Sequence, residues 1–325
     1  MPASACRTST RWTNSSASRD CSDPLMRVAI TGTSGRVGAA LARHLAGAHE
    51  IIPLPRPRPD LADPASIDAA LASLECDVWI HPAAITSLEA CEDDPALAMR
   101  VNAEAPARIA AWCADRGVRM IHISTDYVFD GAATGRIDES APAFPVNVYG
   151  RSKLAGERAV LAHPRHLVLR VSWVFGPEKP SFVDAVFDAA MAGRPLAAVA
   201  DKWSLPTSTA DLSAWILRLL ETDACGALHA CQSGEPASWH DMARCVVDEM
   251  AACGWIAAVP EVRRESLETM EAFRAQRPRF TAMDPARLSA WIGESPRDWR
   301  VALREFVRAK SEARGSGFTA AAGGP

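Results

Sequence analysis

The stretch RVAITGTSGRVG, residues 27–38, decides the fold. It begins as a short apolar run, and its glycines fall at Gly32, Gly35 and Gly38. A Gly-rich turn between a strand and a helix lets backbone N–H groups approach a pyrophosphate, and the field of the helix N-terminus favours the anion. Because helical spacing continues over residues 35–47, we expect a strand, a phosphate loop and a helix of a dinucleotide-binding fold.

The same alternation of apolar strand and helix continues to about residue 176. Repeated strand–helix units favour a parallel sheet covered on both faces, and right-handed crossovers then give a doubly wound α/β fold. After the first strand, strands are expected at residues 50–55, 76–84, 118–125 and 166–176, and helices at residues 63–74, 93–117 and 147–163.

Beyond Gly176 the rhythm becomes irregular and indicates a smaller lobe interwoven with the first domain. Helices are expected there at 181–193, 210–222 and 238–254, and strands at 195–200 and 226–232. The predicted division is an NAD(P)-binding Rossmann domain over 26–175, completed by about 207–232, and an α/β substrate-binding lobe over 176–206 and 233–312.

Both ends of the chain differ from the rest. Residues 1–25 are rich in Ser, Thr and Arg, and they lack the apolar core of a secretory signal. We expect a disordered leader or an upstream start chosen in error before Met26, in preference to an organelle transit peptide. Residues 313–325 are expected to form a flexible tail.

Composition excludes several classes of function. A net charge of −4 in 325 residues gives no reason to expect nucleic acid or an anionic membrane as partner. Runs of about 18 apolar residues, as a transmembrane helix needs, do not occur. Nine scattered cysteines without C-x-x-C indicate a reduced, cytoplasmic chain, and eight scattered histidines predict no metal site. The chain has ten Trp but only two Tyr, Tyr127 and Tyr149.

The end of the second expected strand bears on the choice of dinucleotide. An acid there would bind the ribose 2′-OH of NAD, but the strand runs into Arg56 and Arg58 before the first acid, Asp60. These arginines, with Arg36 in the loop, are placed to meet a 2′-phosphate. The pattern therefore favours NADPH and leaves NADH open, with Asp60 and Leu61 expected beside the adenine ring.

Two further segments indicate catalysis. Ser124 and Thr125 stand at the carboxyl end of the fourth expected strand, where ligands bind in this architecture. Tyr149 and Lys153 are spaced i, i+4 and share one helical face. We expect the Lys153 ammonium to lower the pKa of the Tyr149 phenol, which then gives a proton to a carbonyl oxygen while a hydride reaches its carbon. A Ser124 or Thr125 hydroxyl can hydrogen-bond the same oxygen.

At these residues the chain resembles the extended short-chain dehydrogenase/reductases and, among them, the dTDP-4-dehydrorhamnose reductase family, over roughly residues 26–300. Related nucleotide-sugar dehydratases carry Glu where this chain has Tyr127, which disfavours that branch. The resemblance rests on TGTSGRVG (31–38), STDYVFDG (124–131), NVYGRSKLAGE (147–157), LRVSWVFG (169–176) and SWHDMA (238–243).

The resemblance implies that a hydride from NADPH reduces the 4-keto group of a nucleotide-linked deoxysugar, most directly dTDP-4-dehydrorhamnose to dTDP-rhamnose. Thr125 would polarise the ketone and Tyr149 would donate the proton. Lys153 would tune Tyr149 and hold the nicotinamide ribose. The remaining implied roles are Gly35, Arg36 and Val37 on the pyrophosphate, Ala83 and Ala84 along the cofactor, and Asp126 and Trp173 beside the substrate.

The chain also departs from the family. His81 and Pro82 stand where the family usually has Asn and Ala, and Lys202 replaces a Gln. The family's Arg-Pro-x-Asn-Ser-x-Leu-Asp segment is altered over residues 277–284. Two alternatives therefore stay open, a non-catalytic NADP-binding regulatory subunit and a nucleotide-sugar epimerase. A homodimer is left open as well.

Overall fold

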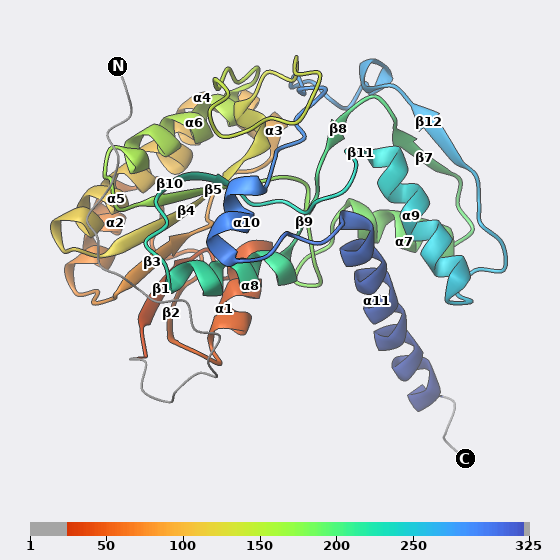
Figure 1. Ribbon diagram of the computed structural model, residues 1–325, viewed down its shortest axis with the longest axis horizontal. Helices are drawn as coiled ribbons and strands as arrows, with labels where there is room; N and C mark the ends of the chain where they lie inside the picture. Colours follow the sequence, from red (N-terminus) through yellow and green to blue (C-terminus); the bar gives the residue numbers. More distant parts are fainter. Residues whose placement is uncertain (1–24, 322–325) are drawn as a thin grey trace.

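A six-stranded parallel sheet organises the larger part of the computed structural model, which describes residues 25–321 (Figure 1). The second strand alone lies on one side of the first, and all later strands lie on the other side, so the order reverses between the first strand and the third. In doubly wound sheets a ligand binds at that reversal, outside the carboxyl ends of the strands. In spatial order the strands are β10 (Gly226–His229), β5 (Leu167–Val171), β4 (Arg119–Thr125), β3 (Val78–His81), β1 (Arg27–Thr31) and β2 (Glu50–Leu54).

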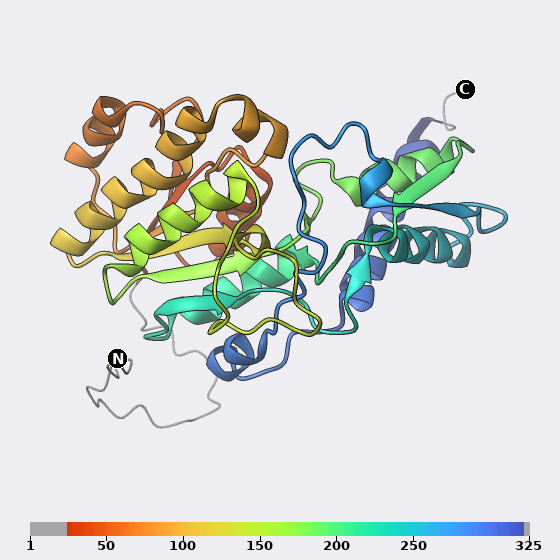
Figure 2. The same ribbon diagram turned by 90° about the horizontal axis from the view of Figure 1, so that it is seen from above.

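Helices cover both faces of this sheet, as the sequence predicts for a doubly wound fold (Figure 2). Alternation along β1 shows why: Val28 and Ile30 pack into one apolar cluster and Ala29 into the other, all fully buried. One face carries α1 (Arg36–Leu45), α8 (Thr209–Leu220) and α10 (Ala286–Ile292); the other carries α2 (Pro64–Ala72), α5 (Ala105–Asp115) and α6 (Val148–Leu161).

The single helix expected over residues 93–117 is divided in the structure. Pro106 has no amide N–H to continue the ladder, and the turn before it widens into a π-helix. The elements in this stretch and just before it are α3 (Leu88–Asp93), α4 (Pro95–Met99), the π-helix η1 (Arg100–Glu104) and then α5.

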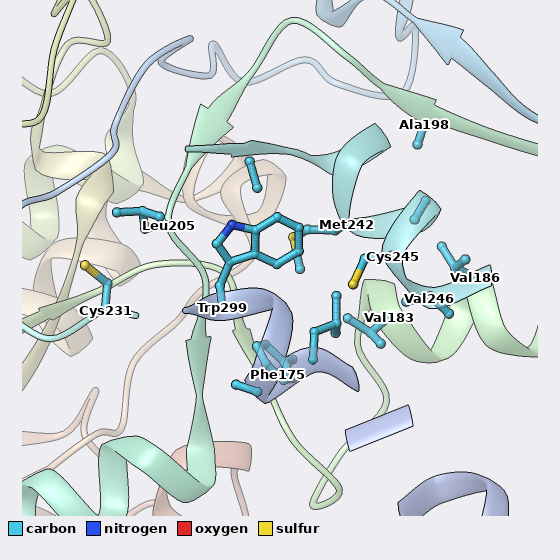
Figure 3. Close-up of a cluster of buried hydrophobic side chains, with 14 of the residues drawn as sticks. Phe175, Val183, Val186, Ala198, Leu205, Cys231, Met242, Cys245, Val246 and Trp299 are labelled. Carbon is cyan, nitrogen blue, oxygen red and sulfur yellow. The ribbon is translucent and has the colours of Figure 1, made fainter. Parts of the chain in front are cut away.

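A second, smaller lobe is built around its own apolar core (Figure 3). Trp299 lies in it almost fully buried, surrounded by Met242 and Val183, and its ring N–H donates to the Glu235 carbonyl at 2.9 Å. Its helices are α7 (Phe182–Met191), α9 (Trp239–Ala252) and α11 (Trp299–Ala321), and its paired strands are β7 (Leu196–Val199) with β12 (Val262–Glu265) and β8 (Trp203–Ser204) with β11 (Ala237–Ser238).

Short elements complete the description. A pair of two-residue strands joins the two parts of the chain, and residues 201–209, where no strand is expected from the sequence, contribute β9 to this pair and β8 to another. They are β6 (Val174–Phe175) and β9 (Thr207–Ser208); the 3-10 turns are η2 (Asp126–Val128) and η3 (Leu267–Thr269).

Two boundaries differ from expectation. Helix α10 falls in the stretch predicted for the lobe, but Leu288 and Ile292 pack into the core beneath the sheet. Helix α11 continues to Ala321, beyond the predicted start of the tail at residue 313. Residues 1–24, which contain nearly all of the predicted leader, lie outside the described range, as do residues 322–325. Within residues 25–321 no helix is long and apolar enough to cross a bilayer.

A buried ion pair ties α6 to the sheet. Glu157 of α6 receives hydrogen bonds from Arg170 of β5 at 2.7, 3.0 and 3.2 Å, and the two side chains are only 1% and 7% exposed. The Arg170 guanidinium also lies 5.2 Å above the Phe129 ring. Removing one partner of such a pair strands the other charge in a medium of low dielectric.

We therefore expect Glu157→Ala to lower the free energy of unfolding by about 3–5 kcal/mol. Asp68→Ala is the matched control, because Asp68 pairs with Arg108 at 2.6 Å on the surface, where such pairs contribute about 0–1 kcal/mol. Guanidinium unfolding monitored by tryptophan fluorescence measures both. Equal, small losses in the two variants would contradict this interpretation of the buried pair.

Candidate active site

A cleft of about 550 Å³ opens at the carboxyl ends of β1, β3 and β4, where the strand order reverses. It collects residues from the phosphate loop, the ends of β3 and β4, the start of α6 and the segment after β5. The predicted site residues that line it are Gly32, Gly35, Arg36, Val37, Gly38, Arg56, Ala83, Ala84, Thr125, Asp126, Tyr149, Lys153 and Trp173.

The phosphate loop is closed by contacts that only glycine permits. Gly32 has φ of +66°, in the left-handed region, and its N–H donates to Leu54 at 2.8 Å. A Cβ on Gly38 would overlap the Gly32 carbonyl and lie 3.0 Å from the Thr33 nitrogen, so the first turn of α1 rests directly on the loop. This close approach leaves room for a pyrophosphate at the N-terminus of α1.

Arg36, which the sequence places to meet a 2′-phosphate, is engaged by the protein itself. Its guanidinium donates to three backbone carbonyls of the segment after β5, those of Val174 at 3.0 Å, Lys179 at 3.3 Å and Pro180 at 2.5 Å. Each of its three nitrogens makes one of these bonds. Arg36 thus holds this wall of the cleft against α1, and a contact between Arg36 and a 2′-phosphate stays a prediction.

A second pocket of about 320 Å³ adjoins the cleft beyond the end of β2. Arg56, Asp60 and Leu61 line it, and Arg56, Gly32 and Ala83 line both cavities. Arg58 lines neither of them. The structure therefore separates two arginines that the sequence could not distinguish, and only Arg56 stands where the two cavities meet.

Strand β4 delivers Thr125 and Asp126 to the cleft. Thr125 caps the turn η2, accepting from the Tyr127 N–H at 3.2 Å, and its hydroxyl donates to Asp126 Oδ1 at 3.2 Å. Both side chains are at least nine-tenths buried. Ser124, the other candidate hydroxyl, also lines the cleft, and its buried Oγ has no hydrogen-bond partner among the described residues.

The start of α6 places Tyr149 against this turn. Asn147 caps the helix by accepting from the Gly150 N–H at 2.7 Å. A Cβ on Gly150 would overlap the Tyr127 carbonyl, so α6 and η2 are in backbone contact. The rings of Tyr127 and Tyr149 consequently meet edge to face at 5.8 Å.

The electrostatics differ from the expectation that Lys153 lowers the pKa of Tyr149. Burial has the largest effect and raises the pKa of Tyr149 above its ordinary value, while a hydrogen bond with Thr125 acts in the opposite direction. The Lys153 ammonium is engaged elsewhere, 3.1 Å from His122 Nε2 and 2.8 Å from the Ile123 carbonyl. Tyr149 is therefore held protonated at neutral pH, as a proton donor must be.

Sequence reasoning missed Asn102, in the π-helical turn η1. It is buried, and its side chain bonds both backbone groups of Ile85, at 2.8 and 3.0 Å, and the Ser152 hydroxyl at 3.0 Å. Asn102 thus holds the segment after β3 to α6. A polar residue among apolar neighbours in RVNAEAPARIAAW was the available signal.

Asp126 joins the cleft to the lobe. Its Oδ2 accepts from three hydroxyls, Ser172 at 2.9 Å, Ser204 at 3.2 Å and Thr281 at 2.5 Å. Next to Ser172, Trp173 has φ of +42°, a conformation that non-glycine residues rarely adopt outside functional sites. Its indole lines the cleft, and the Lys202 ammonium lies over the Trp173 ring, 5.5 Å from the ring centroid.

The sheet, the phosphate loop and the Tyr149–Lys153 helix are arranged as in extended short-chain dehydrogenase/reductases, a class of NAD(P)-dependent oxidoreductases. Within that class, the family described as the RmlD substrate-binding domain matches residues 26–311, and the chain belongs to this family.

Individual relatives and solved structures support this family assignment. The chain is 37% identical over 294 residues to a dTDP-4-dehydrorhamnose reductase of Mycolicibacterium smegmatis, covering 87% of this chain and 85% of the relative. A crystal structure of a dTDP-4-dehydrorhamnose reductase from Clostridium acetobutylicum is similar with a TM-score of 0.80 and 28% identity, over 88% of this chain and 100% of that one. Another, from Bacillus anthracis in complex with NADP, has a TM-score of 0.79 and 28% identity, over 87% and 99%.

The contact at Gly38 gives a test of the phosphate loop. Gly38→Ala should weaken NADPH binding at least tenfold, because the new Cβ displaces the Gly32 carbonyl and with it the loop. Gly47→Ala, at the end of the same helix, has open space for its Cβ and should bind as the parent does. Quenching of tryptophan fluorescence by NADPH measures both dissociation constants. Similar affinities in the two variants would show that the loop does not carry the pyrophosphate.

Proposed function

We propose that the protein catalyses the NADPH-dependent reduction of the 4-keto group of dTDP-4-dehydrorhamnose to give dTDP-rhamnose. The observation that carries this proposal is the meeting of the phosphate loop, Thr125, Tyr149 and Lys153 in one cleft. Relatives named dTDP-4-dehydrorhamnose reductase support the choice of substrate. The complex of the Bacillus anthracis relative with NADP supports the choice of cofactor.

The cofactor fits the two adjoining cavities. The glycines of the phosphate loop leave the space that a pyrophosphate needs, and Asp60 and Leu61 line the pocket where the adenosine would lie. Arg56, between the cavities, is the cation for the 2′-phosphate. When bound, NADPH supplies the hydride for the reduction.

Side chains of the protein supply the proton for the ketone oxygen and stabilise the negative charge that the proton transfer leaves behind. With substrate bound, the Thr125 hydroxyl would turn its proton from Asp126 Oδ1 to the ketone oxygen. Tyr149, kept protonated by its burial, transfers its proton to the same oxygen. Lys153, one helical turn after Tyr149 and also lining the cleft, offsets the charge left on the phenol. Asp126 and Trp173 form the wall on the side of the lobe, where the sugar would lie.

The proposal also covers the cellular compartment and the partners of the protein. We place the reaction in the cytoplasm, supported by the seven cysteines within the described part of the chain, all of which are free thiols. A homodimer stays a prediction from the sequence, and a nucleotide-sugar is the small-molecule partner.

Tyr149→Phe tests the chemistry. Loss of the phenol should lower kcat for NADPH oxidation with dTDP-4-dehydrorhamnose by about 10²–10⁴-fold, while NADPH binding persists. Tyr127→Phe removes the only other phenol of the chain, beside the first, and should retain activity within a few-fold. Absorbance at 340 nm follows the reaction.

The outcomes separate the alternatives. A parent enzyme that binds NADPH without oxidising it would indicate a regulatory subunit. Sugar conversion without net consumption of NADPH would indicate an epimerase. Full activity in Tyr149→Phe would show that another group donates the proton.

Arg56 gives a test of cofactor choice. Arg56→Ala should weaken NADPH binding by about 10–100-fold, the range expected for a lost charge-assisted hydrogen bond, and leave NADH binding unchanged. Arg58→Ala is the control, because Arg58 lines neither cavity. The dissociation constants of both variants for NADPH and NADH are the measurement. A selective loss of NADPH affinity in Arg58→Ala, and not in Arg56→Ala, would refute the assignment of Arg56.

A further inference from the structure

Three polar side chains are buried side by side behind the cleft. Thr31 and His81 are the last residues of β1 and β3, His122 is in the middle of β4, and each is no more than 1% exposed. The strand register pairs His81 directly with His122. Since Ile80 and Ile121 belong to the cluster on the α1 and α8 face, the two histidines point to the opposite face, where α6 packs.

Lys153 of α6 completes this group. Its Nζ lies 3.1 Å from His122 Nε2 and 2.8 Å from the Ile123 carbonyl. The His122 ring stacks on the His81 ring with centroids 5.5 Å apart and an interplanar angle of 20°. His81 Nδ1 in turn lies 2.7 Å from the Thr31 hydroxyl, directly before the phosphate loop. A row of buried polar side chains thus connects Lys153, which lines the cleft, to the start of the phosphate loop.

The two histidines lack complete hydrogen bonding. Among the described residues, neither His81 Nε2 nor His122 Nδ1 has a partner. Burying such nitrogens costs stability that an apolar pair of similar size would not lose. The proposed reaction, as derived above, uses neither ring. The contact of His122 with Lys153 is therefore the one that links this buried group to the proposed chemistry.

We propose that His122 is a positioning residue for the reduction: its Nε2 accepts a hydrogen bond from the Lys153 ammonium, and stacking on His81 holds the ring in the orientation that this bond requires. Only a neutral imidazole can accept at Nε2. Burial and the nearby Lys153 charge lower the pKa of both histidines, to about 3 for His81, which keeps them neutral near neutral pH.

The charges around Lys153 make this acceptor important. Burial lowers the pKa of Lys153 to about 8, and Glu157, one turn further along α6, raises it. Glu157 is already paired with Arg170 of β5, and Tyr149 on α6 is protonated. The neutral His122 ring and the Ile123 carbonyl are then the groups that hydrogen-bond the ammonium and favour its charged form.

A direct test is available because the chain has only four lysines, Lys153, Lys179, Lys202 and Lys310. The full-length protein, labelled with carbon-13 at lysine Cε, can be titrated by NMR, and Lys153→Arg assigns the Lys153 signal. We expect His122→Met to lower the pKa of Lys153 by about one unit, because the ammonium loses an acceptor. His122→Gln retains an acceptor oxygen at that distance along the side chain and should leave the pKa nearly unchanged.

Lys202 is the internal control. It is fully buried, and burial lowers its pKa to about 8 as well, but it bonds the Pro278 carbonyl at 2.7 Å, away from His122. Its signal should not move in either variant. An unchanged Lys153 pKa in His122→Met, an equal fall in His122→Gln, or a parallel shift of Lys202 would each overturn the proposal.

The catalytic consequence rests on the proposed function and is measured separately. In His122→Met the alkaline limb of the kcat profile should move about one pH unit to lower pH, lowering kcat at pH 8 by about fivefold with little change in the KM of the sugar. A lower kcat without that displacement would overturn this part of the proposal. If the parent reduces no keto sugar, the proposed function fails, whereas the NMR titration still decides the role of His122.

Discussion

Direct backbone contact between α6 and its neighbours is the constraint on which the active site depends. At Gly150 a side chain would overlap the carbonyl of Tyr127, and at Gly156 it would overlap the carbonyl of Asn102. These two contacts bring α6 against both the turn after β4 and the π-helical turn η1. Because Tyr149 and Lys153 lie on this helix, their positions relative to Thr125 follow from how closely backbones can approach.

Polar contacts attach the lobe to this assembly, beside the apolar cluster that the two parts share. Asp126, at the end of β4, gathers hydroxyls from the segment after β5, from β8 and from Thr281. On the cofactor side, Arg36 binds carbonyls of β6 and of the segment after it, and Arg43 of α1 pairs with Glu178 in that segment. The wall of the cleft on the side of the lobe is therefore positioned by residues that line the same cleft.

Local pattern was sufficient for much of the architecture. The strand and glycine loop of residues 27–38 and the i, i+4 spacing of Tyr149 and Lys153 depend on neighbours in sequence, and the structure has the expected strand, loop and helices there. The sequence pattern did not predict the structure where segments far apart in the sequence pack against each other. Helix α10 packs on the apolar core beneath the six-stranded sheet, although its sequence lies among residues of the lobe. The π-helical turn at Asn102 precedes Pro106 and is contacted directly by the backbone of Gly156.

The sequence by itself determined the doubly wound fold and the kind of cofactor, and it supplied the candidate reactive side chains, because periodicity, glycine spacing and residue chemistry are local properties. Only the tertiary structure decided what each charged group does. It engages Arg36 with backbone carbonyls, leaves Arg56 at the junction of two cavities, and turns Lys153 toward His122. Those outcomes depend on burial and on partners 31 to 144 residues away along the chain, which no local pattern records.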